Sequence, residues 1–225
     1  MSLSLIILFI FIGITVAIFA YYSNLKRQKE WQQFASNHGF VYSKYDTMSI
    51  PDYYSEYQLF NQGHSRKAYN VCQGRVNGLK ILAFDYQYTT GSGKNHHTHY
   101  FTPLIIESNL VFKPLSIRPE NLFDKIGAAV GFDDIDFESA EFSKKYYVKC
   151  VDKKFAYDII HARMIEFLLE CRNLYIEARG DLLVFHQGKQ LNISEIELLL
   201  MASQKFINFT PDYVRQTITR PSIRS

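Results

Sequence analysis

The first twenty-five residues constrain the chain more than any other segment, because they form an apolar run without a single charged side chain. As a helix, residues 3–22 would be about 30 Å long, which matches the hydrocarbon thickness of a bilayer. Tyr21 and Tyr22 fall where aromatic residues gather at the membrane interface. The segment therefore predicts a transmembrane anchor over residues 1–25.

A cleaved secretory signal is the competing interpretation of this segment. Such a signal opens with basic residues, has a shorter apolar core and ends in small residues at the cleavage site. No Lys or Arg precedes the run, and a cut after Ala20 would place the bulky Ile18 where a small residue is required. An uncleaved signal-anchor is favoured, so the chain is expected to cross the membrane once.

The residues that follow the anchor predict its orientation. Lys26, Arg27 and Lys29 come directly after the apolar run, and basic residues beside a membrane helix tend to remain on the cytoplasmic side. The three cysteines are far apart and have no C-x-x-C spacing, which fits a reducing compartment. We therefore expect the rest of the chain at the cytoplasmic face of a membrane, such as a bacterial inner membrane.

The remaining length suffices for one domain and a few accessory segments. Residues 26–39 predict a juxtamembrane helix that has Trp31 on its apolar side, ends at Gly39 and holds the domain away from the bilayer. Residues 40–210 form the predicted α+β cytoplasmic domain. Residues 211–225 are expected to be a disordered basic tail.

Strand patterns dominate the first part of this domain. From Ala68 onward, aromatic and β-branched residues in an alternating pattern predict strands. Asn77-Gly78 is the strongest short hairpin signal in the chain, and Gly180-Asp181 predicts a second hairpin between two short strands. We expect these strands to form a mainly antiparallel sheet.

Helical patterns supply the other half of the fold. A stripe of apolar residues behind a predicted Asp152 cap indicates a helix near 155–171. A capping box that begins at Asn192 indicates another near 193–207, and residues 118–127 predict a short helix. The predicted fold class is α+β, with an N-terminal transmembrane helix followed by one domain whose sheet is packed by the two longer helices.

The charge balance argues against a nucleic-acid partner. Lys and Arg number 25 and Asp and Glu 22, so the formal net charge is only +3. No Lys/Arg-rich run occurs in the predicted domain, whereas nucleic-acid binding generally requires a concentrated basic surface.

Residues 88–101, YTTGSGKNHHTHYF, are the stretch that most resembles a chemical site. A phosphate-binding loop is excluded, because Lys94 is followed by Asn95 where a hydroxyl residue is required, and no helix pattern follows. Neither a G-x-S-x-G nucleophile motif nor a G-x-G-x-x-G dinucleotide-binding motif occurs in the sequence. The sequence therefore predicts no catalytic residue and no cofactor.

A metal site is the remaining chemical interpretation of this stretch. If the hairpin pairs Thr90 with His96, then His97 and His99 share one face and Asp85 lies diagonal to His99. Two imidazoles and a carboxylate can hold a cation such as zinc, but a slip of one residue destroys the arrangement. Asp85, His97 and His99 are thus the candidate metal ligands, and a solvated hairpin is the simpler alternative.

Four segments carry a resemblance to a known group of proteins: FDYQYTTGSGK, IRPENLFDKIG, DFESAEFSKKYYV and AYDIIHARMIEFLLE. Together they resemble bacterial membrane-anchored domains of unknown function, over residues 79 to about 185. The resemblance implies an anchor followed by one α+β domain. It implies no reaction, cofactor or partner.

The function predicted from the sequence is binding at the cytoplasmic membrane face, with an unidentified protein partner. Sixteen tyrosines and eighteen phenylalanines fit an interaction surface, because aromatic residues anchor interfaces, although core packing explains many of them. The alternative function is a metal-dependent hydrolase that uses the histidine and aspartate side chains of the 79–106 hairpin. Lipid contact through basic residues is a third interpretation, and whether the protein is an enzyme is left open.

Overall fold

The structure is a computed structural model that describes residues 3–120, 135 and 137–218. The helix predicted over 118–127 lies mostly outside these residues. Its first two positions, Arg118 and Pro119, are the end of a strand, where they pair with Tyr147 and Tyr146.

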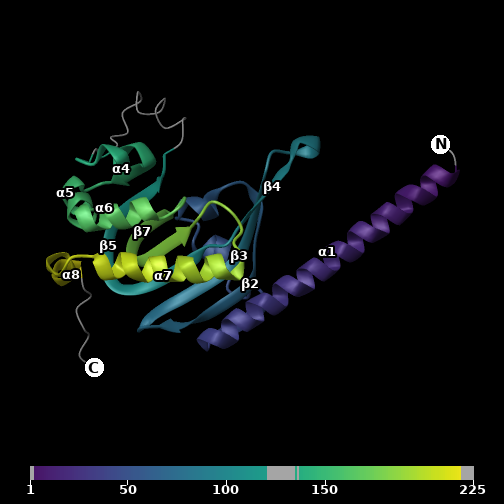
Figure 1. The fold of residues 1–225 in the computed structure, drawn as a ribbon, viewed down its shortest axis with the longest axis horizontal. Helices are drawn as coiled ribbons and strands as arrows, with labels where there is room; N and C mark the ends of the chain where they lie inside the picture. Colours follow the sequence, from purple (N-terminus) through teal and green to yellow (C-terminus); the bar gives the residue numbers. More distant parts are fainter. Residues whose placement is uncertain (1–2, 121–134, 136, 219–225) are drawn as a thin grey trace.

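A seven-stranded antiparallel sheet is the centre of the domain (Figure 1). Its strands are β1 (Val41–Tyr45), β2 (His64–Val76), β3 (Leu79–Thr90), β4 (His97–Phe101), β5 (Leu104–Pro119), β6 (Tyr146–Cys150) and β7 (Tyr175–His186). The strand order is β1-β2-β3-β5-β6, while β4 pairs with β3 and β7 pairs with β5. The predicted α+β class with a mainly antiparallel sheet is therefore confirmed.

The Asn77-Gly78 turn joins β2 to β3 as predicted. Both residues have positive φ angles, 50° and 82°, which is the backbone that a two-residue hairpin turn requires and that Asn and Gly tolerate best. Val76 pairs with Leu79 directly across the turn.

The second predicted hairpin is wrong, because Gly180-Asp181 lies inside the single strand β7. Residues on both sides of Gly180 pair with β5, and Gly180 itself pairs with Phe112 at a shift in register. The positive φ of Gly180, 59°, therefore produces an irregularity in one long strand instead of a reversal, a common use of glycine in sheets.

The helices of the described chain are α1 (Leu3–His38), α2 (Ile50–Tyr53), α4 (Ala140–Lys145), α5 (Lys153–Ile159), α6 (Ala162–Glu170), α7 (Ile193–Phe209) and α8 (Asp212–Ile218), with short 3₁₀ turns η1 (Gln58–Asn61) and η2 (Gly93–Asn95). The Asn192 capping box of α7 is present, with bonds in both directions to Glu195. The helix predicted over 155–171 is instead the pair α5 and α6. Its chain turns at His161, whose ring Nε2 donates to the carbonyl oxygen of Phe209 at 2.9 Å.

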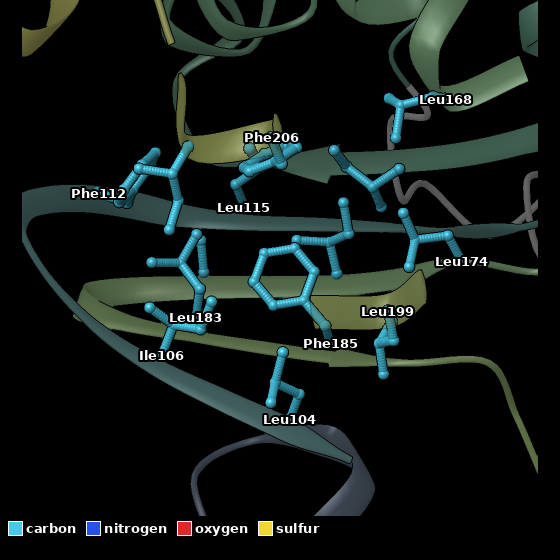
Figure 2. Close-up of a cluster of buried hydrophobic side chains, with 14 of the residues drawn as sticks. Leu104, Ile106, Phe112, Leu115, Leu168, Leu174, Leu183, Phe185, Leu199 and Phe206 are labelled. Atoms are coloured by element: carbon cyan, nitrogen blue, oxygen red, sulfur yellow. The ribbon is translucent and has the colours of Figure 1, made fainter. Parts of the chain in front are cut away.

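The two faces of the sheet carry separate cores, because successive side chains of a strand point to opposite sides. On one face lie α1, α5, α6, α7 and α8, and their apolar side chains pack on residues such as Ile81 and Ala83 of β3. Figure 2 shows part of this core, where side chains from β5, β7, α6 and α7 meet around Phe185. On the other face, α2 and η1 cover Leu82 and Phe84.

The end of the chain differs from the predicted tail. Residues 212–218 are helical and bury Val214 and Ile218 against the main core, and Arg215 Nε donates to the carbonyl oxygen of Thr210 at 2.8 Å. The predicted disorder therefore does not hold for α8, and residues 219–225 lie outside the described residues.

Candidate functional site

Helix α1 is a single helix that belongs to two environments. It is long and apolar enough to span a membrane, and none of its most apolar window is buried against the domain. Further along the same helix, Trp31 and Phe34 are fully buried and Ala35 is 2% exposed. Residues 26–38 are helical, as expected, but they are not separate from the domain, because this segment forms one wall of the core.

The contact between α1 and the sheet is organised around Asp85, whose side chain is completely buried. Arg27 donates to both carboxylate oxygens, from Nη2 to Oδ1 at 2.7 Å and from Nε to Oδ2 at 3.1 Å. Three further donors complete the group: Trp31 Nε1 at 2.8 Å, Asn70 Nδ2 at 3.0 Å and Thr102 Oγ1 at 3.1 Å. We call these five residues the Asp85 clasp.

The clasp satisfies a charge that would otherwise be strongly unfavourable in the core. An isolated buried carboxylate costs several kcal/mol unless it is paired and hydrogen-bonded. Here a bidentate Arg27 contact, the strongest geometry for such a pair, is supported by three further donors, one on the same helix, one on β2 and one just after β4. The ion pair is also shielded from solvent, since the Arg27 side chain is only 17% exposed.

Local sequence explains why these groups meet. Arg27 and Trp31 are four residues apart and so lie on the same side of α1, and the Arg27 guanidinium carbon is 5.4 Å from the Trp31 ring centroid. Asp85 follows Ala83 by two positions on β3, so it points to the face that α1 covers. A charged residue inside the apolar run LAFDY is the sequence signal for the clasp, because a buried carboxylate needs a partner.

The clasp also connects more distant parts of the domain. Thr102 Oγ1 accepts from the backbone N–H of Leu191 at 3.0 Å, just before α7 begins. Asn70 Oδ1 accepts from Tyr42 of β1 at 2.9 Å. Through Asp85, helix α1 is thus tied to β1, β2, β3 and the start of α7.

The predicted metal cluster depends on a register that the structure does not have. Thr90 pairs with His97 instead of His96, and Tyr88 pairs with His99. Because directly paired residues share a face, this shift of one residue places both histidines on the Tyr88 side of the sheet and Asp85 on the other. Asp85, His97 and His99 are therefore not brought together.

The two histidines have other neighbours. Thr90 Oγ1 and His99 Nε2 are 2.9 Å apart, and the His99 ring stacks on Tyr88 with centroids separated by 4.9 Å. The His97 and His99 rings meet edge to face at 4.6 Å. Among the residues that the structure describes, no three His, Cys, Asp or Glu side chains form a group that could hold a metal ion. The alternative of a metal-dependent hydrolase on this hairpin is not supported.

A cleft of about 590 Å³ lies beside the clasp, between α1 and the sheet. Its lining residues are Tyr21, Asn24, Leu25 and Gln28 of α1, Lys44 and Tyr45 of β1, Tyr69 and Asn70 of β2, Gln87 of β3 and Tyr100 of β4. We call this the interfacial cleft. The pKa of Tyr69 is raised to about 12, first by burial and then by the nearby Asp85 carboxylate, so its phenol remains neutral at physiological pH.

The cleft offers neutral polar groups and aromatic rings, with one cation. Its lining contains no carboxylate, and Lys44 is its only charged side chain. Phenol, amide and ammonium groups of this kind orient a polar ligand by hydrogen bonds.

The fold and the clasp together define a class of protein: an α+β domain docked on its own N-terminal apolar helix. No protein-family model matches the chain, and no curated protein matches it. Among solved structures, the chain is similar to the crystal structure of the mycobacterial trehalose monomycolate transport factor A, TtfA. The TM-score is 0.55 at 11% sequence identity, over 87% of this chain and 98% of that one. This likeness shows a shared fold.

Proposed function

We propose that the protein is a single-pass membrane-anchored binding domain that presents the interfacial cleft at the cytoplasmic membrane surface. The observation that carries this proposal is the continuity of α1, which passes from an uncovered apolar window into the Asp85 clasp without a break. A domain joined to its anchor in this way is held at a fixed position relative to the bilayer instead of on a flexible tether.

The position of the cleft supports a binding role at the membrane. Tyr21 lies at the end of the apolar run and also lines the cleft, so the cleft begins at the depth where interfacial aromatic residues reside. The structural neighbour is named as a transport factor, which is compatible with a protein that binds and does not catalyse. The ligand would be a membrane component or a segment of a membrane protein partner.

The anchor is tested by alkaline extraction of membranes from cells that produce the full-length protein. We expect the protein to remain in the membrane pellet, as an integral protein does. A variant with Ile10→Lys and Phe11→Lys should be lost from the pellet, because each lysine at the centre of a membrane helix is unfavourable by about 3 kcal/mol. Release of the unchanged protein by alkali would contradict the anchor.

The cytoplasmic orientation is proposed from Lys26, Arg27 and Lys29 and is tested by thiol labelling. A Lys153→Cys variant, in a background with Cys150→Ser and Cys171→Ser, places a thiol on the domain, and Cys72 stays unlabelled because it is buried. In bacterial cells we expect a membrane-impermeant maleimide to react only after the inner membrane is permeabilised. Labelling before that step would place the domain on the outer side.

Binding in the cleft is tested by photo-crosslinking in cells. A benzophenone amino acid replaces Tyr100, which is 48% exposed and lines the cleft. The matched control replaces Tyr53, which is 73% exposed and lies outside it. We expect a discrete adduct at position 100 and none at position 53. Equal or absent crosslinking at the two positions would argue against a binding role for the cleft.

A further inference from the structure

Helix α1 and strand β3 leave the Asp85 clasp in the same direction. Trp31 and Arg27 of α1 bond Asp85, and Asn24 and Tyr21, further toward the N-terminus, line the interfacial cleft. On the sheet, Gln87, the next residue of β3 on the same face as Asp85, lines the same cleft. Figure 1 shows the result, since the β3–β4 hairpin projects from the domain toward the side where the N-terminal half of α1 lies. The hairpin therefore points toward the membrane that α1 enters.

The hairpin extends further from the clasp than the polar part of α1 does. Six residues of strand separate Asp85 from Gly91, a length of about 20 Å. Five residues of helix separate Arg27 from Tyr22, the end of the apolar run, a length of only about 8 Å. If α1 crossed the bilayer along its normal, the tip of the hairpin would reach past the boundary of the hydrocarbon.

The hairpin tip cannot enter hydrocarbon because of its composition. Residues 91–97, GSGKNHH, are all exposed and contain no apolar side chain larger than glycine. They include Lys94, His96 and His97, and no Asp or Glu occurs anywhere from Tyr86 to Ile106. A polar segment with exposed backbone groups is strongly disfavoured inside a bilayer, whereas its basic side chains suit the phosphate level.

Internal hydrogen bonds hold the tip in shape. His64 Nε2 donates to the carbonyl oxygen of Gly91 at 2.9 Å, and His96 Nδ1 donates to that of Gly93 at the same distance. Gly91 has a φ of 75°, and a Cβ at this position would lie 2.2 Å from the carbonyl oxygen of Asn95. These hydrogen bonds and the close approach at Gly91 favour one tight turn conformation, which fixes the position of Lys94 and His96 relative to the sheet.

We propose that the tip of the β3–β4 hairpin, residues 91–97, is a second membrane contact that binds the headgroups of anionic phospholipids. The inference rests on the proposed membrane anchor. With the tip on the headgroup surface, α1 crosses the bilayer at a tilt that lifts the tip out of the hydrocarbon, and tilts of about 20° are ordinary for such helices. Two contacts fix the orientation of the domain, and the interfacial cleft between them opens toward the lipid.

The contact is tested with the full-length protein reconstituted into phosphatidylcholine vesicles with and without phosphatidylglycerol. A fluorophore is attached to Ser92→Cys, an exposed and uncharged tip position, in the Cys150→Ser, Cys171→Ser background. The matched control carries it on Arg75→Cys of β2, which pairs with Lys80 at the opposite end of β3. We expect lipids brominated near the headgroup to quench the label at 92 several-fold more than the label at 75. A His96→Gln, His97→Gln variant that carries the label at 92 should leave the anchor intact.

The charge dependence gives a second readout. Quenching at position 92 should increase with phosphatidylglycerol and decrease in high salt, since contacts with anionic lipid are screened. The double glutamine variant, probed by the same label, should show a weaker response to phosphatidylglycerol. Equal quenching by aqueous iodide at both positions, with none by brominated lipid, would overturn the proposal. Failure of the anchor is distinguishable, because the protein would then not resist alkaline extraction from the vesicles.

Discussion

Arg27 of the apolar helix and Asp85 of strand β3 form a bidentate ion pair across 58 residues of sequence, with atom separations of 2.7 and 3.1 Å. One partner follows the apolar run that ends at Tyr22 by five residues, and the other lies on β3 inside the sheet. Movement of either element relative to the other requires this buried pair to break, so the clasp governs the coupling between anchor and domain.

The pair can be tested by a double-mutant cycle on the full-length protein in detergent micelles. Arg27→Ala and Asp85→Ala should each lower the free energy of unfolding by about 3–5 kcal/mol, because each leaves one buried charge without its partner. The double variant should lose clearly less than the sum of the two. Lys26→Ala, whose side chain is 80% exposed, is the control and should change stability little. Additive losses would show that the two side chains do not interact.

Trp31 provides an optical measure of helix docking, because it is the only tryptophan and is fully buried. Its emission should shift to longer wavelength on unfolding, at the same denaturant concentration at which the sheet melts by circular dichroism. Trp31→Phe keeps an aromatic six-membered ring but removes the indole N–H that donates to Asp85. We therefore expect the free energy of unfolding to fall by about 1–3 kcal/mol. A tryptophan transition well before the sheet transition would indicate that α1 undocks independently.

Gly74 is required by a close approach of β2 to Phe40. A Cβ at position 74 would lie 2.1 Å from Phe40 Cδ1, so Gly74→Ala should lower stability by about 1–3 kcal/mol through overpacking. Phe40→Leu in the same chain should recover part of that loss by making room. Gln73→Ala, at the exposed neighbouring position, is the control. If Phe40→Leu gives no recovery, the clash is not the cause.

His186 predicts an acid-sensitive contribution to stability. Burial lowers its pKa to about 3, and its ring stacks on Tyr175 with centroids 4.4 Å apart. Between pH 6.5 and pH 3 the unfolded chain binds a proton at this residue that the folded protein does not, so stability should fall as the pH decreases through this window. The ring retains some contact with solvent, which limits the size of the effect.

The measurement is the unfolding free energy of the wild type and of His186→Gln from pH 7.5 to 4. The variant should show a shallower decrease than the wild type over the window. His97→Gln, which changes an exposed histidine, is the control and should retain the wild-type slope. Parallel curves for all three proteins would remove His186 as the source of acid sensitivity.

Local chemistry made several elements predictable from sequence alone. The Asn77-Gly78 turn, the Asn192 capping box and the stop at Gly39 depend on neighbouring residues, and the structure has all three. The apolar stripe behind Asp152 is buried from Phe155 to Leu168, as its pattern predicts, although its last member, Cys171, is only half-buried and the helix is divided at His161. These features depend on interactions within one or two turns of chain.

Long-range pairing limited the prediction of the candidate site. The register of the β3–β4 hairpin depends on whether its turn has five residues, as predicted, or six, as in the structure, where Thr90 pairs with His97. The sequence offers no preference strong enough to decide between the two lengths. The partners of Asp85 come from α1, β2 and the residue after β4, so no spacing in the sequence connects them. The charge within the apolar run LAFDY is the one sequence signal from which a buried partner of Asp85 could have been expected.

The shared use of α1 also sets an order of assembly. Residues 27–35 leave the ribosome before β3, β5 and α7, which complete their surroundings. All three elements begin 52 residues or more after Arg27 and cannot pack until they are made. Under the proposed anchoring, the apolar half of α1 enters the bilayer before these elements are made. The domain would then finish folding at the membrane surface, against a wall already in place, and a chain without its helix would lack part of its own interior.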